Sequence, residues 1–318
     1  MLNHIFCIKH LDKVISTFIA YFAAVFLSML QIIINSLTSF SLLLLLGASI
    51  SLIYGASRFI DASLAGVVTY CCYSLYIFHS LHFSLVTAIT LSLASSICLA
   101  ILMHHYLFRR LMSTDNAGMN ALLASLGVYL ILQNVLAASF GNDVKIVSNG
   151  MVETGHDFFG AYTTNIQLAT MLVSILCFVS LLLLLRYTWL GLVIRALSSN
   201  VELCQLLGIR TQRIALRTIA IGISLGSVAA ILSALDTGMT PNMGFRLLMN
   251  GLIVMVIGGV GSIRGLLGGA LLLATAQTLT SYYLDSKWMD AISFVILIVF
   301  LIWKPLGFSG RRLKKVEI

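Results

Sequence analysis

Few residues of this chain of 318 have the types and spacing that chemistry needs. Two histidine pairs, His79 with His82 and His104 with His105, offer imidazole nitrogens, but no carboxylate stands at metal-ligand spacing from either pair. The HExxH pattern is missing, and so is the GxxxxGK[ST] loop that binds nucleotide phosphates. We therefore expect no metal site, no cofactor in this chain and no enzymatic activity. An intramembrane enzyme is the alternative from a different class.

The composition is that of a membrane protein. The chain is 59% hydrophobic and only 9% charged, with a mean hydropathy of +1.03, whereas soluble domains carry roughly 25% charge. Backbone groups in hydrocarbon have no water to bond, so the spans must be helices. We predict an all-α, polytopic transmembrane helix bundle in a single domain, 1–318, with about ten spans. The uncharged stretches that predict these spans are 14–35, 36–57, 62–78, 83–103, 116–142, 158–185, 218–235, 247–263, 265–284 and 291–303.

The distribution of positive charge predicts the orientation. If the N-terminus is cytoplasmic and the ten spans alternate, sixteen of the nineteen Lys and Arg residues lie inside, and only Lys145, Arg246 and Lys287 lie outside. Lys and Arg collect in cytoplasmic loops, so we expect both termini in the cytoplasm. The net charge of +8 then reflects topology, and we expect no nucleic-acid partner. Arg264 would be costly inside one helix from 247 to 284, which favours two spans meeting at an inner turn.

Small residues predict where the helices touch. Glycines spaced four or eight apart lie on one face of a helix and let two backbones approach closely in lipid. The predicted contact residues are Gly47, Gly55, Gly222, Gly226, Gly261, Gly265 and Gly269. Among the few polar residues inside spans, Gln133, Asn134 and Asn250 are candidates for lining a solute pathway, although such residues also serve as plain interhelical hydrogen bonds.

The longest cytoplasmic segment, 186–217, contains the sharpest local pattern. Ser199 and Glu202 have the S-x-x-E spacing of a capping box, which predicts a short helix. Leu203, Leu206 and Leu207 form its apolar face, and Gly208 follows where a residue with positive φ ends a helix. A helix of two turns is marginal alone, so we expect a partner surface to hold these leucines.

These residues carry a resemblance. Glu202-Leu203-Cys204, followed by three residues and Gly208, resembles the cytoplasmic motif of ABC-importer membrane subunits that couples to the ATPase. The segments 188–209, 241–244, 258–269 and 304–308 resemble the branched-chain amino acid permease family of the LivH type, as do 130–134 and 140–141. One stretch departs from that family: Asp61-Ala62-Ser63-Leu64-Ala65-Gly66 replaces its usual Asn, aromatic, Ala, His, Gly pattern.

The resemblance implies a permease subunit of an ATP-driven importer in the bacterial inner (plasma) membrane, passing a small amino acid, branched-chain or otherwise hydrophobic, or a related solute. It implies cytoplasmic ATPase subunits that bind ATP and Mg, a second permease, identical or paralogous, and an extracytoplasmic solute-binding protein. A permease for urea or short amides stays open, as does a secondary carrier. The absence of an ionisable relay inside the predicted spans disfavours the carrier.

Overall fold

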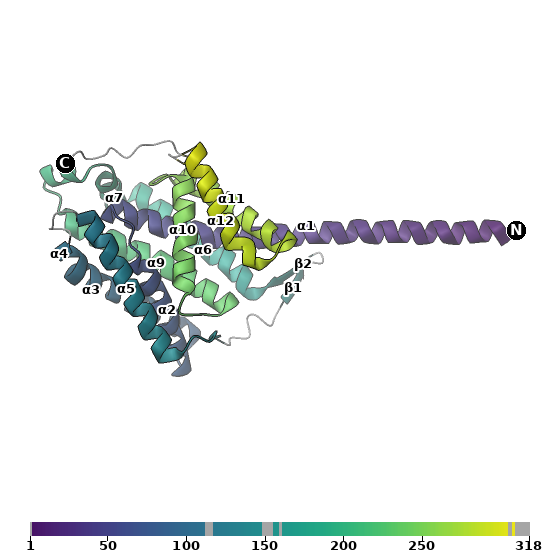
Figure 1. Ribbon diagram of the computed structural model, residues 1–318, viewed down its shortest axis with the longest axis horizontal. Helices are drawn as coiled ribbons and strands as arrows, with labels where there is room; N and C mark the ends of the chain where they lie inside the picture. Colours follow the sequence, from purple (N-terminus) through teal and green to yellow (C-terminus); the bar gives the residue numbers. More distant parts are fainter. Residues whose placement is uncertain (1, 112–116, 148–154, 159–160, 305–306, 309–318) are drawn as a thin grey trace.

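The computed structural model describes residues 2–111, 117–147, 155–158, 161–304 and 307–308, and it is helical through most of them (Figure 1). The long helices are α1 (Leu2–Ser57), α2 (Ser63–Ser80), α3 (Leu85–Met103), α5 (Ala117–Phe140), α6 (Asn165–Tyr187), α9 (Thr211–Thr237), α10 (Met243–Gly258), α11 (Ile263–Tyr283) and α12 (Met289–Trp303). The short elements are η1 (His104–Phe108), α4 (Arg109–Leu111), β1 (Gly155–Phe158), β2 (Ala161–Thr164), α7 (Trp189–Ser199), α8 (Val201–Leu206) and η2 (Ser286–Trp288).

One continuous helix, α1, contains two of the predicted spans. The stretches 14–35 and 36–57 were expected as separate spans, but the helix runs unbroken from Leu2 to Ser57, so that prediction is wrong. The physical reason is that the chain has no glycine or proline before Gly47 to form a turn. Lys13 and Arg58 are then separated by roughly 65 Å of helix, at a rise of about 1.5 Å per residue. Such a helix gives no support for placing both residues on the inner side, nor for a cytoplasmic N-terminus.

Six helices in the described residues are long and apolar enough to cross a membrane. They cover 27–57, 85–111, 118–140, 165–187, 211–237 and 286–303. The last contains the predicted stretch 291–303, extended at its start by η2. Three more helices, α2, α10 and α11, are shorter or less apolar and pack among these six. Within the described chain the bundle therefore has nine long helices where ten spans were expected.

Close backbone approach places α1 at the centre of the bundle, against α6, α9, α10 and α11. A Cβ atom added to Gly47 would lie 2.5 Å from Val254 Cγ1, and one added to Gly226 would lie 2.8 Å from Ser49 Oγ. The Ser49 hydroxyl donates a hydrogen bond of 2.7 Å to the Gly222 carbonyl oxygen. Small residues thus bring α9 and α10 onto α1, as is typical of helix pairs in lipid.

A glycine-rich turn separates α10 from α11, which confirms the predicted break before Arg264. Gly259 and Gly261 have φ of 87° and 76°, a region that L side chains rarely adopt. A Cβ atom on Gly265 would overlap the carbonyl oxygen of Gly258, so the two helices leave the turn in backbone contact. Gly261 itself has nothing within 4 Å of a Cβ position. It serves the turn, and its contact with α1 is a backbone hydrogen bond to Ser51.

Two other predicted contact glycines also lie close to neighbouring helices. A Cβ atom added to Gly269 would lie 2.9 Å from the Val254 carbonyl oxygen, and one added to Gly55 would lie 3.4 Å from Ser198 Cβ.

At the opposite end of the bundle from α7, the hairpin β1–β2 precedes α6 (Figure 1). The Gln31 side chain of α1 bonds both backbone groups of Tyr162, at 3.0 Å and 3.1 Å. These bonds attach the hairpin to α1 and mark the end of the bundle farthest from the glycine turn.

The contact between α10 and α11 gives the first prediction. Gly265→Ala forces the backbone at Gly258 to move, and such overpacking costs about 1–3 kcal/mol. We expect a lower midpoint of thermal unfolding for the detergent-solubilised protein, followed by size-exclusion recovery. The matched control is Gly118→Ala in α5, where nothing lies within 4 Å and alanine favours the helix by about 1 kcal/mol. Equal midpoints for the two variants would contradict the packing.

Candidate functional site: the inner α7–α8 segment and the polar row of α10

Two short helices, α7 and α8, form the segment in which the sequence pattern was sharpest. The Thr188 hydroxyl accepts a hydrogen bond of 3.1 Å from the Gly191 backbone and so caps the start of α7. The side-chain oxygen of Asn200 accepts a bond of 3.2 Å from the Leu203 backbone and caps α8. The capping residue was predicted to be Ser199, which is wrong, because Ser199 is the last helical residue of α7. Asn200 has the extended backbone (φ −150°, ψ 112°) that an N-cap requires.

The end of α8 has the geometry that the sequence predicts. Gly208 has φ of 75°. The Ile209 backbone N–H donates to the Cys204 carbonyl at 3.0 Å, and the Gly208 N–H donates to the Gln205 carbonyl at 2.9 Å. This pair of bonds is a Schellman motif, in which a residue with left-handed backbone satisfies the last carbonyls of a helix. The side chain of Glu202 lies outside the described residues.

One side of α8 is buried against the bundle, and the other side is exposed. Cys204 is 3% exposed against the bundle, whereas Leu203, Leu206 and Leu207 are 55%, 83% and 77% exposed. Full burial of a leucine side chain is worth about 1.5–3 kcal/mol, so three of them on one short helix make an effective docking face. Because α8 lies in the middle of the arginine-rich segment 186–217, the positive-inside rule predicts that this face is cytoplasmic.

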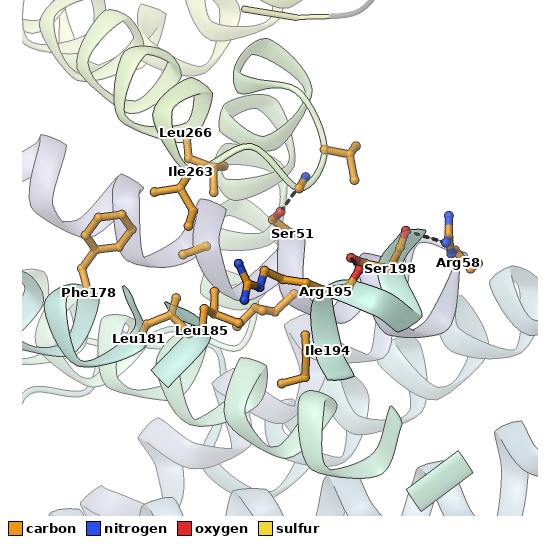
Figure 2. Close-up of a pocket in the computed structure, with 15 residues that line it drawn as sticks. Ser51, Arg58, Phe178, Leu181, Leu185, Ile194, Arg195, Ser198, Ile263 and Leu266 are labelled. Carbon is orange, nitrogen blue, oxygen red and sulfur yellow. Dashed lines mark hydrogen bonds between the residues drawn. The ribbon is translucent and has the colours of Figure 1, made fainter. Parts of the chain in front are cut away.

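Arg58, directly after α1, holds this segment to the bundle. Its Nη2 donates to the Ser198 carbonyl at 2.6 Å and to the Leu197 carbonyl at 3.3 Å, at the end of α7 (Figure 2). A cation at a helix C-terminus satisfies free carbonyls and interacts favourably with the helix dipole. These bonds fix the end of α7 to the residue that follows α1, and α1 in turn contacts α9, α10 and α11.

A cavity of about 110 Å³ lies behind α7, between α1, α6 and the glycine turn (Figure 2). Its walls are mostly apolar, and the guanidinium of Arg195 points into it from α7. The Ser51 hydroxyl accepts a hydrogen bond of 3.3 Å from the Gly261 backbone, which connects α1 to the turn.

A second polar feature follows one face of α10. Asn242, Arg246 and Asn250 are spaced by four residues and so share that face. The Gln133 amide of α5 donates to Asn242 Oδ1, and Tyr129 of α5 stacks on Phe245 with ring centroids 5.5 Å apart. We call Asn242, which directly precedes α10, and Arg246 and Asn250 of α10 the polar row.

Arg246 is the residue that sequence reasoning missed. It was assigned to an outer loop because the uncharged stretch begins at 247, whereas α10 begins at Met243. Gly244 packs directly against the Ala65 carbonyl of α2, so this end of α10 starts inside the bundle. Arg246 is exposed, and in the described part of the chain it has no hydrogen bond or ion pair. A spacing-of-four search from Asn250 back to Asn242 would have found it.

The structure separates the other predicted pathway residues. Asn250 Oδ1 accepts from Gln277 Nε2 at 3.2 Å, and Gln277 also donates to Ser293 Oγ at 2.8 Å, so Asn250 belongs to a network between α10, α11 and α12. Asn134 is exposed on α5, and its side-chain amide donates to the Leu130 carbonyl one turn earlier in the same helix, at 2.7 Å. Of the three predicted residues, Asn250 belongs to the polar row, Gln133 bonds its member Asn242, and Asn134 makes no hydrogen bond to the row within the described residues.

The stretch that departs from the expected family pattern begins at a buried acid. Asp61 is 9% exposed, and one of its oxygens accepts bonds of 3.0 Å and 2.5 Å from the backbone and hydroxyl of Ser63. Burial raises the pKa of Asp61, and the two bonds from Ser63 partly oppose that rise. Across the described residues no three His, Cys, Asp or Glu side chains gather where a metal ion would be held.

Comparison with known proteins places the chain in a family. Residues 32–301 match the family model described as "Branched-chain amino acid transport system / permease component". The high-affinity branched-chain amino acid transport system permease protein LivH of Escherichia coli (strain K12) is 35% identical over 196 residues, which cover 60% of this chain and 64% of that protein. LivH of Salmonella typhimurium is 34% identical over the same length and coverage. BraD of Pseudomonas aeruginosa is 29% identical over 197 residues, with coverages of 60% and 64%.

The alignments thus span about two thirds, 64%, of the length of these relatives. The family model covers most of this chain, including the α7–α8 segment, the polar row and the glycine turn. Its apolar helices make the chain a multi-pass membrane protein. The chain therefore belongs to the family of branched-chain amino acid transport system permease components.

Proposed function

We propose that this chain is the membrane-spanning permease subunit of an ATP-binding-cassette importer in the bacterial inner membrane, and that its solute is a small amino acid with a branched-chain or other hydrophobic side chain. Family membership supports the solute class, since the relatives named above are branched-chain amino acid permeases. The sequence has no phosphate-binding loop, so ATP and Mg bind to separate ATPase subunits.

The exposed leucine face of α8 is the observation that carries the proposal. A capped helix of six residues that, with the residue after it, displays three leucines is unstable as a free surface and is suited to fit a groove on a partner protein. We assign this face to the ATPase. Movement of the ATPase then shifts α8 and α7, and Arg58 transfers the shift to α1.

The polar row supplies the pathway in this proposal. Its exposed residues would line a channel once a second permease, identical or paralogous, covers this side of the bundle. Arg246 offers an unpaired guanidinium, which would bind the carboxylate of an amino acid with a charge-assisted hydrogen bond worth about 1.5–3 kcal/mol. A solute-binding protein outside the membrane delivers the amino acid, and Gln133 and Asn250 extend the polar surface on either side of Arg246.

The end of α8 gives a test of coupling. Gly208→Val places a β-branched residue in left-handed backbone, which costs roughly 1–2 kcal/mol, so the correctly ended helix becomes about tenfold less populated. We expect solute-stimulated ATP hydrolysis by the assembled complex to fall by about the same factor while the amount of permease in the membrane is unchanged. Gly208→Asn is the control, because asparagine tolerates this backbone. Full stimulation in Gly208→Val, with normal assembly, would show that α8 is not the coupling element.

Arg246 gives a test of the pathway. Arg246→Gln removes the charge, and we expect kcat/KM for leucine uptake into membrane vesicles to fall about 10- to 100-fold, the loss of one charge-assisted bond. Arg246→Lys should keep much of the rate because the charge remains. Lys287→Gln removes a positive charge beyond the end of α11 and should leave uptake unchanged. If Arg246→Gln and Lys287→Gln transport equally well, Arg246 does not contact the solute.

A further inference from the structure

A second cavity, of about 250 Å³, lies at the inner end of the bundle and has no place in the transport scheme above. The end of α1, the π-helical turn η1, the end of α7 and the starts of α8 and α9 surround it. Its polar lining consists of Ser57, Arg58, His104, Arg109, Thr211 and Gln212. Among the described residues that line it, none is acidic. The described lining therefore gives two permanent positive charges no counter-charge.

The backbone around this cavity is held in unfavourable conformations at two places. Arg58 has φ of 62°, a left-handed conformation that costs a residue other than glycine of order 1–3 kcal/mol. Residues His104–Phe108 form a π-helical turn, a rare element that is found most often at functional sites. Both departures bring a nitrogen-bearing side chain to the cavity, Arg58 from the first and His104 from the second.

Two buried nitrogen atoms at the cavity have no partner in the described structure. They are Nε of Arg58 and Nδ1 of His104, and the whole His104 side chain is only 5% exposed. A buried polar atom without a hydrogen bond costs about 1–3 kcal/mol, so native proteins rarely leave one unsatisfied. Both atoms belong to residues that line the same space, which indicates a missing partner that occupies it.

The start of α9 adds a third attraction for negative charge. The preceding residue, Arg210, makes no side-chain capping bond, and Thr211 and Gln212 of the first turn line the cavity. The Thr211 and Arg213 backbone N–H groups donate to the Ile209 and Arg210 carbonyls, at 2.8 Å and 3.0 Å, so the attraction here comes from the positive end of the α9 dipole, which favours anions. We propose that this cavity binds a phosphate group through Arg58, His104, Arg109 and the first turn of α9. The phosphate belongs to an acidic phospholipid headgroup or is free inorganic phosphate.

A bound phosphate would join parts of the chain that move in coupling. Arg58 would then bond the phosphate through Nε while its Nη2 still holds the end of α7. The anion thus bridges α1, η1 and α9 directly beneath α8. This site stands on its own geometry and does not depend on the transported solute or on the ATPase.

The test uses the full-length chain in nanodiscs of phosphatidylcholine, with two probes. In one arm phosphatidylglycerol replaces part of the lipid, and in the other inorganic phosphate is titrated into discs of phosphatidylcholine alone. The readouts are the midpoint of thermal unfolding and the lipid that stays bound in native mass spectrometry. We expect one arm to raise the midpoint in a saturable way, and the arm that does so identifies the source of the phosphate.

Two variants distinguish binding at this cavity from nonspecific attraction of anions to the positive charge of the protein. Arg109 is exposed, so Arg109→Gln should fold, and we expect its apparent affinity for the effective probe to fall about tenfold, as for one lost charge-assisted bond. The control is Arg213→Gln, which removes a positive charge from the first turn of α9 at a residue that does not line the cavity. Its affinity for the probe should stay within about twofold of that of the parent protein. The proposal is overturned if neither probe stabilises the parent protein, or if the two variants lose affinity equally.

Discussion

Hydrocarbon offers no hydrogen bonds to a polypeptide, and the whole structure depends on that constraint. Wherever a helix ends within the bundle, its free backbone groups must find partners in the protein. Each break between helices shows how this is done. Ser262 caps α11 through the Gly265 backbone at 3.1 Å, Asn200 caps α8, and Arg58 bonds the last carbonyls of α7. The breaks are therefore the places where specific side chains are required, and the functional features lie at the breaks.

The same constraint explains why so many contacts are made by small residues. The hydrophobic effect does not drive helices together within lipid, so they are held by close packing and by hydrogen bonds between them. Gly226 lets α9 approach Ser49 of α1, and Gly47 of α1 gives room to Val254 of α10. Gly261, in the turn before α11, donates to Ser51 of α1. The result is a central helix in contact with most of the bundle, whose inner end is bonded to α7. In the proposed coupling, a displacement of α7 would reach α10 through α1, which contacts both helices.

Sequence patterns predicted those features that local rules control. Gly208 ends α8 in left-handed backbone, and the glycines around 258–265 form a turn, because both depend on backbone geometry within a few residues. The cap of α8 was misplaced by one residue, since Ser199 and Asn200 both suit an N-cap and only the extent of α7 decides between them. The unbroken α1 was also missed: a charge-free stretch of 44 residues, 14–57, is long enough for two spans, and length alone does not show a turn.

Arg246 shows the limit of reading spans from charge. A rule that ends each span at a charged residue cannot find a charge that lies within a helix, and only the contact of Gly244 with α2 shows that α10 begins earlier. The pair of buried nitrogens at Arg58 and His104 was equally hidden, since the two residues are 46 positions apart. Features that depend on several helices meeting required the three-dimensional arrangement.

The central claim is that the leucine face of α8 contacts an ATP-hydrolysing subunit. A photoreactive amino acid placed at Leu207, with a second variant carrying it at Tyr282 near the far end of α11, tests this in membranes that hold the assembled transporter. Both positions are exposed, so both report freely on their neighbours. The account predicts that position 207 crosslinks to the ATP-binding subunit and that position 282 does not. A crosslink to that subunit from 282, or only lipid adducts from 207, would contradict it.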